Sequence, residues 1–312
     1  MTCSPFQKLV IASICAASLF VPLLAAADDV AAPSPQNTVA ILGDTKWCLR
    51  LPLDGPVAYR GVASFDEAGT GTGSFLYPAP NAVGMLAAVF THALFVDSAK
   101  KDQKDKLQIA ADKVLLPYKA ILDKFNYRDL LRRAVEKTPT GVNAKIIEAT
   151  GDPGREIVVE SAPVFSLTQD QKAVVLDNAI VIHVPGTAPE AAYRTTMRVV
   201  SSPRDVADPT AFWTANDGEK IKDESAKLVS ESLIIAFHDA AASANRDSVP
   251  YRTIRYREGS AEKIERAQVL SNHCDRMLIR TLRGTLMSIP SSQSAPLGSV
   301  ADPCGPVATS PN

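Results

Sequence analysis

The sequence AVGMLAAVFTHALFV, residues 82–96, is a compact apolar run, and the charged block KKDQKDK follows it at residues 100–106. Asn81 is a suitable N-cap for a helix that begins at residue 82. This helix is apolar on all sides, which indicates burial or contact with a membrane surface or a partner. It spans about 22 Å, less than the roughly 30 Å of a bilayer core. We therefore expect a buried core helix, and the alternative is an exposed apolar contact through Leu86, Phe90 and Phe95.

An amphipathic segment continues this region to Lys137. Apolar residues recur at helical spacing from Leu107 to Phe125. Pro117 lacks a backbone donor and disfavours helix at the residue before it, so we expect a break or kink there. A further helix is predicted over residues 127–137, with Gly141 beyond its end. Residues 81–137 together predict a packed helical subassembly.

From Ala144 onward the hydrophobic period is that of strands. Apolar runs at residues 145–148 and 157–160 flank Gly151-Asp-Pro-Gly154, which predicts a turn between two paired strands. Asp177-Asn178 interrupts the apolar run 173–184 and predicts a tight hairpin turn. A strand over residues 193–200, a polar loop holding Trp213 and a long helix over residues 219–242 follow.

These elements predict an α+β fold, in which a mixed, largely antiparallel sheet packs against several helices. The expected α/β domain spans residues 39–290, with the helical subassembly at 81–137 and the sheet and long helix at 144–290. Residues 28–38 read as a linker. Residues 291–312 are rich in Pro and nearly uncharged, which predicts a disordered tail.

The first 27 residues have the parts of a secretory signal peptide. Lys8 precedes an apolar run from Leu9 to Leu24, and three alanines precede Asp28. We expect cleavage after Ala27, a periplasmic or secreted location, and no transmembrane segment in the mature chain. A membrane anchor and a lipoprotein are the alternatives, but the run is short for a span and the residues before Cys15 do not resemble a lipobox.

Three cysteines follow the predicted cleavage site, namely Cys48, Cys274 and Cys304. In an oxidising compartment we expect one disulfide and one remaining thiol. Pairing of Cys48 with Cys304 would join the two ends of the mature chain, whereas pairing of Cys274 with Cys304 would fix the tail. The spacing does not choose among the three pairings, nor does it exclude three free thiols.

A basic stretch lies near the C-terminus. Residues 252–290 hold eight basic and four acidic residues, a net charge of +4. Arginine forks suit phosphate and carboxylate, so Arg255, Arg257, Arg280 and Arg283 are candidates for an anion- or partner-binding site. The alternative is two strands that carry solvated arginines on one face, paired with Glu258, Glu262 and Glu265.

Several function classes lack support in the sequence. The net formal charge of −1 argues against bulk nucleic-acid binding. No nucleophile elbow, Walker loop, dinucleotide fingerprint or zinc motif is present, so we expect no cofactor and assign no catalytic or metal-binding residue. The glycines at 69, 71 and 73 favour a hairpin loop over a phosphate cradle, because no Lys-Ser/Thr pair follows them. Scattered histidines, His92, His238 and His273, are the only hint of a hydrolase.

Several segments resemble a loose group of uncharacterised bacterial cell-envelope proteins. They are the run from Gly84 to His92, ADKVLLPY at 111–118, Asp129-Leu-Leu, RTLRG at 280–284 and Ser288-Ile-Pro290. The sheet region is similar to small α/β domains of periplasmic assembly proteins and of the curli-secretion lipoprotein. The resemblance covers residues 55–290. No functional residues carry over from this group. The predicted secretion, the absence of a catalytic motif and the two candidate contact regions lead us to expect a non-enzymatic periplasmic protein that binds or helps assemble an envelope protein, lipid or glycan. A periplasmic hydrolase is the alternative.

Overall fold

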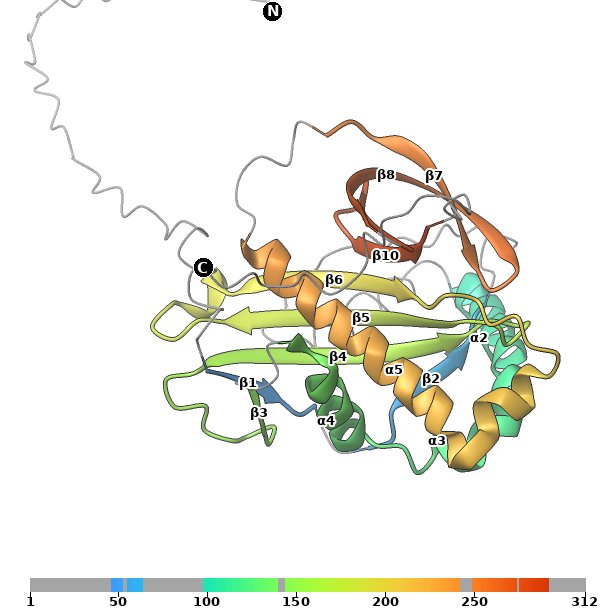
Figure 1. Cartoon of the computed structure of the whole chain (residues 1–312), viewed down its shortest axis with the longest axis horizontal. Helices are drawn as coiled ribbons and strands as arrows, with labels where there is room; N and C mark the ends of the chain where they lie inside the picture. The colour runs from blue at the N-terminus through green and yellow to red at the C-terminus, as the bar shows by residue number, and fades with distance from the viewer. Residues whose placement is uncertain are drawn as a thin grey trace, which may run out of the picture. The chain divides into compact units, whose positions relative to one another are not determined.

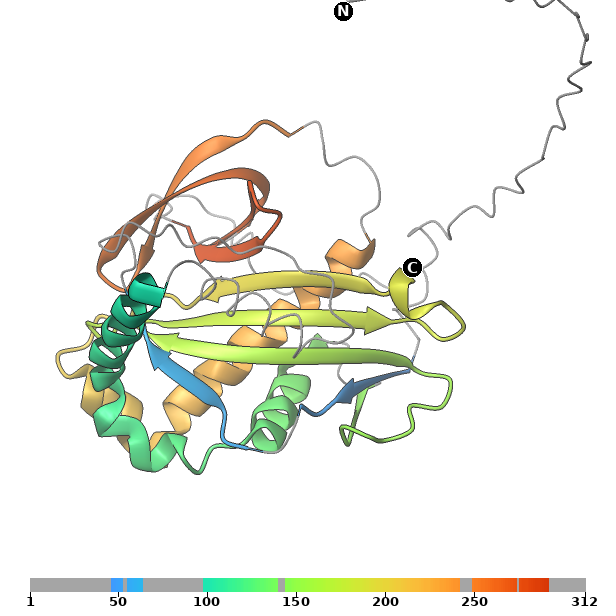
Figure 2. The same ribbon diagram turned by 180° about the vertical axis from the view of Figure 1, so that it is seen from behind.

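A ten-stranded mixed sheet with helices packed on it forms the centre of the computed structural model (Figures 1 and 2), and the fold is α+β. The structure describes residues 46–52, 55–63, 98–139, 144–241, 249–273 and 275–291, without the side chains of 98–104, 241 and 273. The predicted signal peptide, linker and apolar helix, and the predicted tail beyond residue 291, lie outside the described residues. The strands are β1 Trp47–Arg50, β2 Ala58–Gly61, β3 Ala144–Ile147, β4 Ile157–Leu167, β5 Val174–His183, β6 Tyr193–Val200, β7 Arg252–Glu258, β8 Ala261–His273, β9 Arg276–Thr281 and β10 Leu286–Pro290. The helices are α2 Ser98–Asp112, η3 Lys113–Tyr118, α3 Lys119–Leu122, α4 Tyr127–Lys137, η5 Pro189–Ala191 and α5 Pro209–Ala241.

The strand order is β3-β1-β4-β5-β6-β10-β9-β8-β7, and β2 pairs with β4 beside this path. Neighbours are antiparallel within β4-β5-β6 and within β10-β9-β8-β7. The remaining pairs are parallel: β1 with β3 and β4, β2 with β4, and β10 with β6. Two antiparallel blocks are therefore joined by one parallel pair, and short parallel strands extend the first block.

β1 separates β3 from β4, so the predicted pairing of residues 145–148 with 157–160 is wrong. Trp47 pairs with Ala144 on one side and with Ile157 on the other. Trp47, Cys48 and Leu49 are fully buried, and an apolar strand buries more surface between two strands than at a sheet edge. The turn signal at residues 151–154 located a loop but did not identify the partner strand.

β5 runs unbroken through Asp177-Asn178, so the hairpin turn predicted there is also wrong. Asn178 is fully buried. Its side-chain amide donates to Ser232 Oγ at 2.9 Å, and its carbonyl accepts from Ser161 Oγ at 3.0 Å. Because these polar groups have partners across the sheet and on α5, the chain needs no turn to solvate them.

The local signals around α4 are confirmed. α4 begins and ends at the predicted residues, and the Asn126 side chain accepts the backbone N–H of Asp129 at 2.9 Å as an N-cap. Pro117 lies in η3, a 3₁₀ segment that interrupts the regular α-helix. The proline ring and its missing N–H donor explain the interruption at this position.

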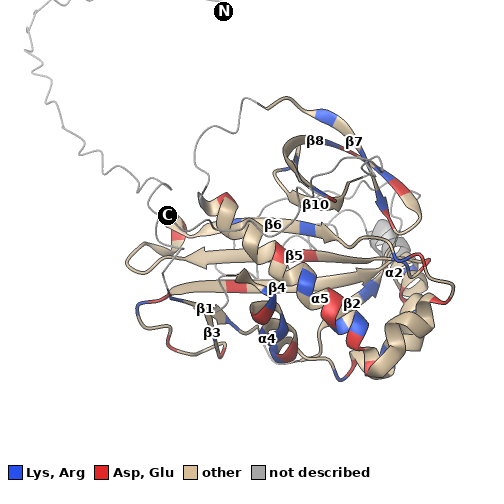
Figure 3. Cartoon of the chain, viewed as in Figure 1, with Lys and Arg blue, Asp and Glu red and all other residues tan. Residues whose placement is uncertain are grey.

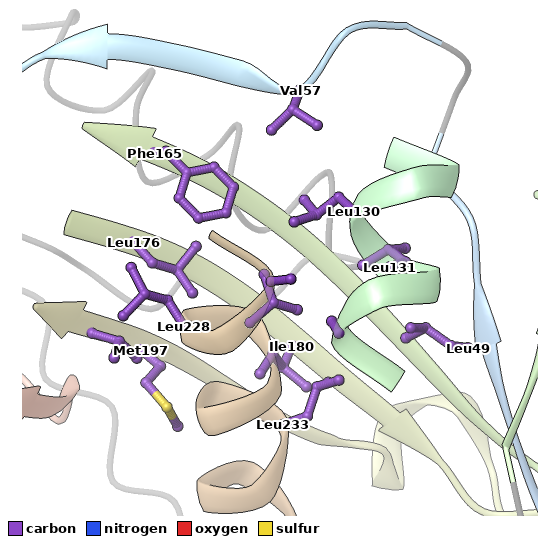
Figure 4. Close-up of a cluster of buried hydrophobic side chains, with 14 of the residues drawn as sticks. Leu49, Val57, Leu130, Leu131, Phe165, Leu176, Ile180, Met197, Leu228 and Leu233 are labelled. Carbon is purple, nitrogen blue, oxygen red and sulfur yellow. The ribbon is translucent and has the colours of Figure 1, made fainter. Parts of the chain in front are cut away.

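One face of β4, β5 and β6 packs beneath α4 and α5. The labelled side chains of Figure 4 point into this core from both layers, for example Phe165 and Ile180 from the sheet and Leu131 and Leu233 from the helices. Trp47 meets Phe237 of α5 edge to face, with ring centroids 5.2 Å apart. Among the described residues, no helix is both long and apolar enough to cross a bilayer.

The opposite face of the sheet contributes a smaller core that positions the β7–β8 hairpin. Val175 of β5 and Val200 of β6 belong to one buried cluster with Ile254 and Tyr256 of β7 and Ile279 of β9. The strands β7 to β10 continue the sheet beyond β6 (Figure 1). The inner side of the hairpin is therefore part of the hydrophobic core, and its other side faces outward.

Candidate anion-binding surface

From Thr253 to Glu258, exposed and buried side chains alternate along β7. Ile254, Tyr256 and Glu258 are buried, whereas Arg255 and Arg257 are exposed. Residues that pair directly across two strands point to the same side of the sheet. The β7–β8 register pairs Thr253 with Arg266, Arg255 with Ile264 and Arg257 with Glu262. These six residues share the outward side, and we call them the hairpin basic face.

The hairpin basic face has a net charge of +2, because three arginines face one carboxylate. Arg255 Nη1 donates to Glu262 Oε1 at 2.6 Å, and both side chains are well exposed, so this pair contributes little to stability. Arg257 and Arg266 form no ion pair with any described residue. Ile264, beside them, is 58% exposed. Figure 3 shows the basic positions along β7.

The tip of the hairpin is fixed to the β4–β5 turn. The backbone N–H of Ser260 donates to Asp170 Oδ2 at 2.6 Å. Gly259 has φ +62°, which favours glycine, and a Cβ there would lie 2.4 Å from Asp170 Oδ1 and displace that carboxylate. Burial raises the pKa of Asp170, but hydrogen bonds from Thr168, Lys172 and Ser260 outweigh it and lower the pKa. Asp170 is therefore a charged acceptor that holds the tip.

A charged cluster on the main sheet holds the hairpin from its inner side. Arg198 donates to the two oxygens of Asp177 at 2.8 and 2.9 Å, and Arg60 donates to Asp177 at 3.0 Å. Arg198 also lies 3.7 Å from Glu258 of β7, by an Nη1–Oε1 contact. Burial raises the pKa of Asp177, but the charges of Arg198 and Arg60 outweigh it and lower the pKa. Two arginines and two carboxylates balance one another here, so the cluster orients the hairpin instead of attracting an anion.

The structure divides the four arginines predicted as one site. Arg255 and Arg257 lie together on the hairpin basic face. Arg280 is half-buried on β9, where its Nη2 donates to Asp239 Oδ1 of α5 at 2.6 Å. Arg283 lies in the turn after β9. Arg280 therefore connects sheet and helix, and Arg266 takes its place as the third arginine of the surface.

Arg266 was absent from the predicted site, although a signal for it existed. The residues Glu258-Gly-Ser-Ala261 form a tight turn, and pairing outward from that turn places Arg266 opposite Thr253. The alternative set of ion pairs is present only in part. Glu262 pairs with Arg255, whereas Glu258 turns inward toward Arg198.

The remaining predicted contacts are only partly visible. Leu86, Phe90 and Phe95 lie outside the described residues, as do Cys274 and Cys304. Cys48 is a buried free thiol in β1, and burial raises its pKa. The disulfide therefore stays a prediction.

The histidines that are described do not assemble a catalytic group. His238 is exposed in the last turn of α5. His183 Nε2 lies 3.8 Å from Glu160 Oε1, and Arg50 Nη1 donates to the same oxygen at 3.1 Å. Within the part of the chain that the structure describes, no three His, Cys, Asp or Glu side chains are grouped to hold a metal ion.

Neither a scan against models of protein families nor a search of curated proteins finds a match to this chain. The resemblance to envelope proteins stays a prediction. We therefore base the function on the hairpin and its charges.

Proposed function

We propose that this chain is a non-enzymatic protein of the cell envelope that binds an acidic protein partner through the hairpin basic face. The observation that carries the proposal is three arginines on one side of a fixed strand pair, with a single carboxylate among them. Arg257 and Arg266 have no ionic partner among the described residues, so their guanidinium groups can form bidentate bonds to carboxylates.

The surface suits a protein partner because charge surrounds an apolar centre. Ile264 lies opposite Arg255 in the strand register and remains largely exposed. Arginine and apolar anchors with a polar rim are typical of protein interfaces. The hairpin is anchored at its tip by Asp170 and from within by Tyr256, so little conformational entropy is lost when a partner binds.

A location in the envelope follows from the predicted signal peptide and from the resemblance to envelope proteins. The alternative function, a periplasmic hydrolase, has less support from the described residues, because His238 is exposed at a helix end. His92 and the side chain of His273 are not described, so the hydrolase stays a prediction from sequence.

Photo-crosslinking in intact cells that produce the full chain tests this proposal. A photoreactive residue replaces Ile264, and the same residue at Leu116 of η3, which is 68% exposed, serves as the matched control. We expect an adduct with an acidic envelope protein from position 264 and none from position 116. The double substitution Arg257→Glu and Arg266→Glu should reduce the adduct about tenfold, since charge complementarity governs the encounter.

Two exposed lysines outside the hairpin provide the charge control. Lys113→Glu with Lys124→Glu changes the net charge equally and should leave the adduct unchanged. An adduct that forms equally from position 116, or that survives the arginine reversal, would show that this face is not the binding surface. An adduct with phospholipid in place of protein would refute the protein partner.

A further inference from the structure

α5 consists of two helical limbs, residues 209–214 and 219–241, joined by a left-handed turn (Figure 1). Asn216, Asp217 and Gly218 have φ of +54°, +55° and +76°. Residues with a side chain rarely adopt positive φ, so two such residues in succession are strained and packing must offset the cost. The turn brings the first limb back toward the second, because the amine of Lys220 lies 4.0 Å from the centroid of the Phe212 ring.

An open pocket of about 370 Å³ lies at this corner, and we call it the corner pocket. Phe212 of the first limb forms an apolar wall. Lys220, Glu224 and Lys227 recur at helical spacing along the second limb. Lys137, at the end of α4, and Arg204, before α5, complete the basic lining. Side chains from three separate segments therefore converge on one cavity.

Two of the four cations in the corner pocket are neutralised by carboxylates. Arg204 Nη2 donates to Glu224 Oε2 at 2.6 Å, and Lys137 Nζ lies 3.4 Å from Asp223 Oδ1. Lys220 contacts the Phe212 ring instead of a carboxylate, and Lys227 forms no ion pair with any described residue. The lining therefore retains a charge of +2.

The two free lysines also determine which hydrogen bonds the corner pocket can form. Each lysine ammonium supplies three N–H donors and no acceptor, so Lys220 and Lys227 favour an anion with several acceptor oxygens.

We infer that the corner pocket binds a small molecule that carries a phosphate monoester. Such a group has a charge near −2 at pH 7 and three acceptor oxygens, which match the charge and the N–H donors of Lys220 and Lys227. The Phe212 wall contacts the remainder of the molecule. This site shares no residue with the hairpin basic face and does not depend on the function proposed above.

Isothermal titration calorimetry of the full chain with phenyl phosphate tests the inference, because this probe joins a phosphate monoester to an apolar ring. Lys220→Gln and Lys227→Gln should each raise the Kd about tenfold, as expected for the loss of one charged hydrogen bond. Lys124→Gln, which removes an exposed lysine elsewhere, should not change the Kd. Phenyl sulfate has the same shape and a single charge, so it should bind at least about tenfold more weakly.

Unchanged urea midpoints will establish that these surface variants are folded. The inference would be overturned if phenyl phosphate did not bind at millimolar concentration, or if neither lysine substitution changed its Kd. Equal affinity for phenyl sulfate would show that the site does not select a dianion, and would overturn the assignment of a phosphate monoester. The phosphate monoester could belong to a lipid headgroup or to a soluble molecule, and sedimentation with phosphatidylcholine vesicles that contain phosphatidic acid distinguishes the two. Sedimentation that depends on Lys220 and Lys227 indicates a lipid. Absence of sedimentation indicates a soluble ester. The variant with Arg257→Glu and Arg266→Glu should bind phenyl phosphate normally, which separates this site from the hairpin.

Discussion

Replacement of Gly218 by alanine should destabilise the protein strongly, because two independent costs meet at this residue. Its φ of +76° is left-handed, and a Cβ at this position would lie 2.4 Å from Ile121 Cγ2 of α3 and 3.2 Å from its Cδ1. Cγ2 is a branch at the Cβ of isoleucine, so it has little rotational freedom to move aside.

The magnitude follows from adding the two costs. An alanine in the left-handed region is less stable than glycine by about 1 kcal/mol. Forcing a methyl group into filled space costs roughly 1–3 kcal/mol more. We therefore expect Gly218→Ala to lower the free energy of unfolding by about 3 kcal/mol, a large part of the roughly 5–15 kcal/mol that stabilises a typical domain.

Equilibrium unfolding in urea, followed by tryptophan fluorescence, measures this loss. Trp47 and Trp213, the two tryptophans of the sequence, are both 1% exposed, and Trp213 lies beside the turn. Gly186→Ala is the matched control, since Gly186 has φ +79° and nothing lies within 4 Å of a Cβ built on it. It should cost only the backbone part, about 1 kcal/mol.

Ile121→Leu provides a rescue, because leucine keeps the volume of isoleucine but moves its branch away from Gly218. In that background Gly218→Ala should cost little more than Gly186→Ala does. If Gly218→Ala and Gly186→Ala were equally mild, or if Ile121→Leu relieved nothing, the close contact between the α5 turn and α3 would not exist as described.

Two further predictions concern the polar groups that hold the fold. Asp177→Asn should lower the free energy of unfolding at pH 7 by about 2 kcal/mol. Breaking a fully buried ion pair costs roughly 3–5 kcal/mol, and the loss should be smaller here because the Arg198 side chain is 37% exposed. The folded state lowers the pKa of Asp177, so its contribution is present above about pH 4 and is lost as the pH falls through the folded pKa. Urea midpoints between pH 7 and pH 3 should therefore fall less steeply for Asp177→Asn than for the wild type, and parallel curves would contradict this role. Asn126→Ala removes the N-cap of α4 and should cost about 1 kcal/mol; hydrogen exchange should show faster opening of the first turn of α4, and unaltered exchange would exclude the cap.

The sequence alone determined those features of helices and strands that depend on only a few neighbouring residues. Asn126 sets the start of α4, and Pro117 interrupts the helix before it, because a cap and a missing donor act on adjacent backbone groups. The alternation of Arg255, Tyr256 and Arg257 likewise separates the inner and outer sides of β7, since a strand repeats every two residues. These features depend on no distant partner.

Tertiary structure decided what each segment pairs with. β1 lies between β3 and β4, and Asp177 continues a strand where the sequence predicted a turn, because distant arginines and serines satisfy the polar groups there. Arg280 and Arg266 carry the same charge, yet Asp239 of α5 engages Arg280 and the β8 register turns Arg266 outward. Which strands pair depends on the burial of apolar surface between segments far apart in the chain. Only the packing of the folded chain therefore determines which arginine retains a free guanidinium group.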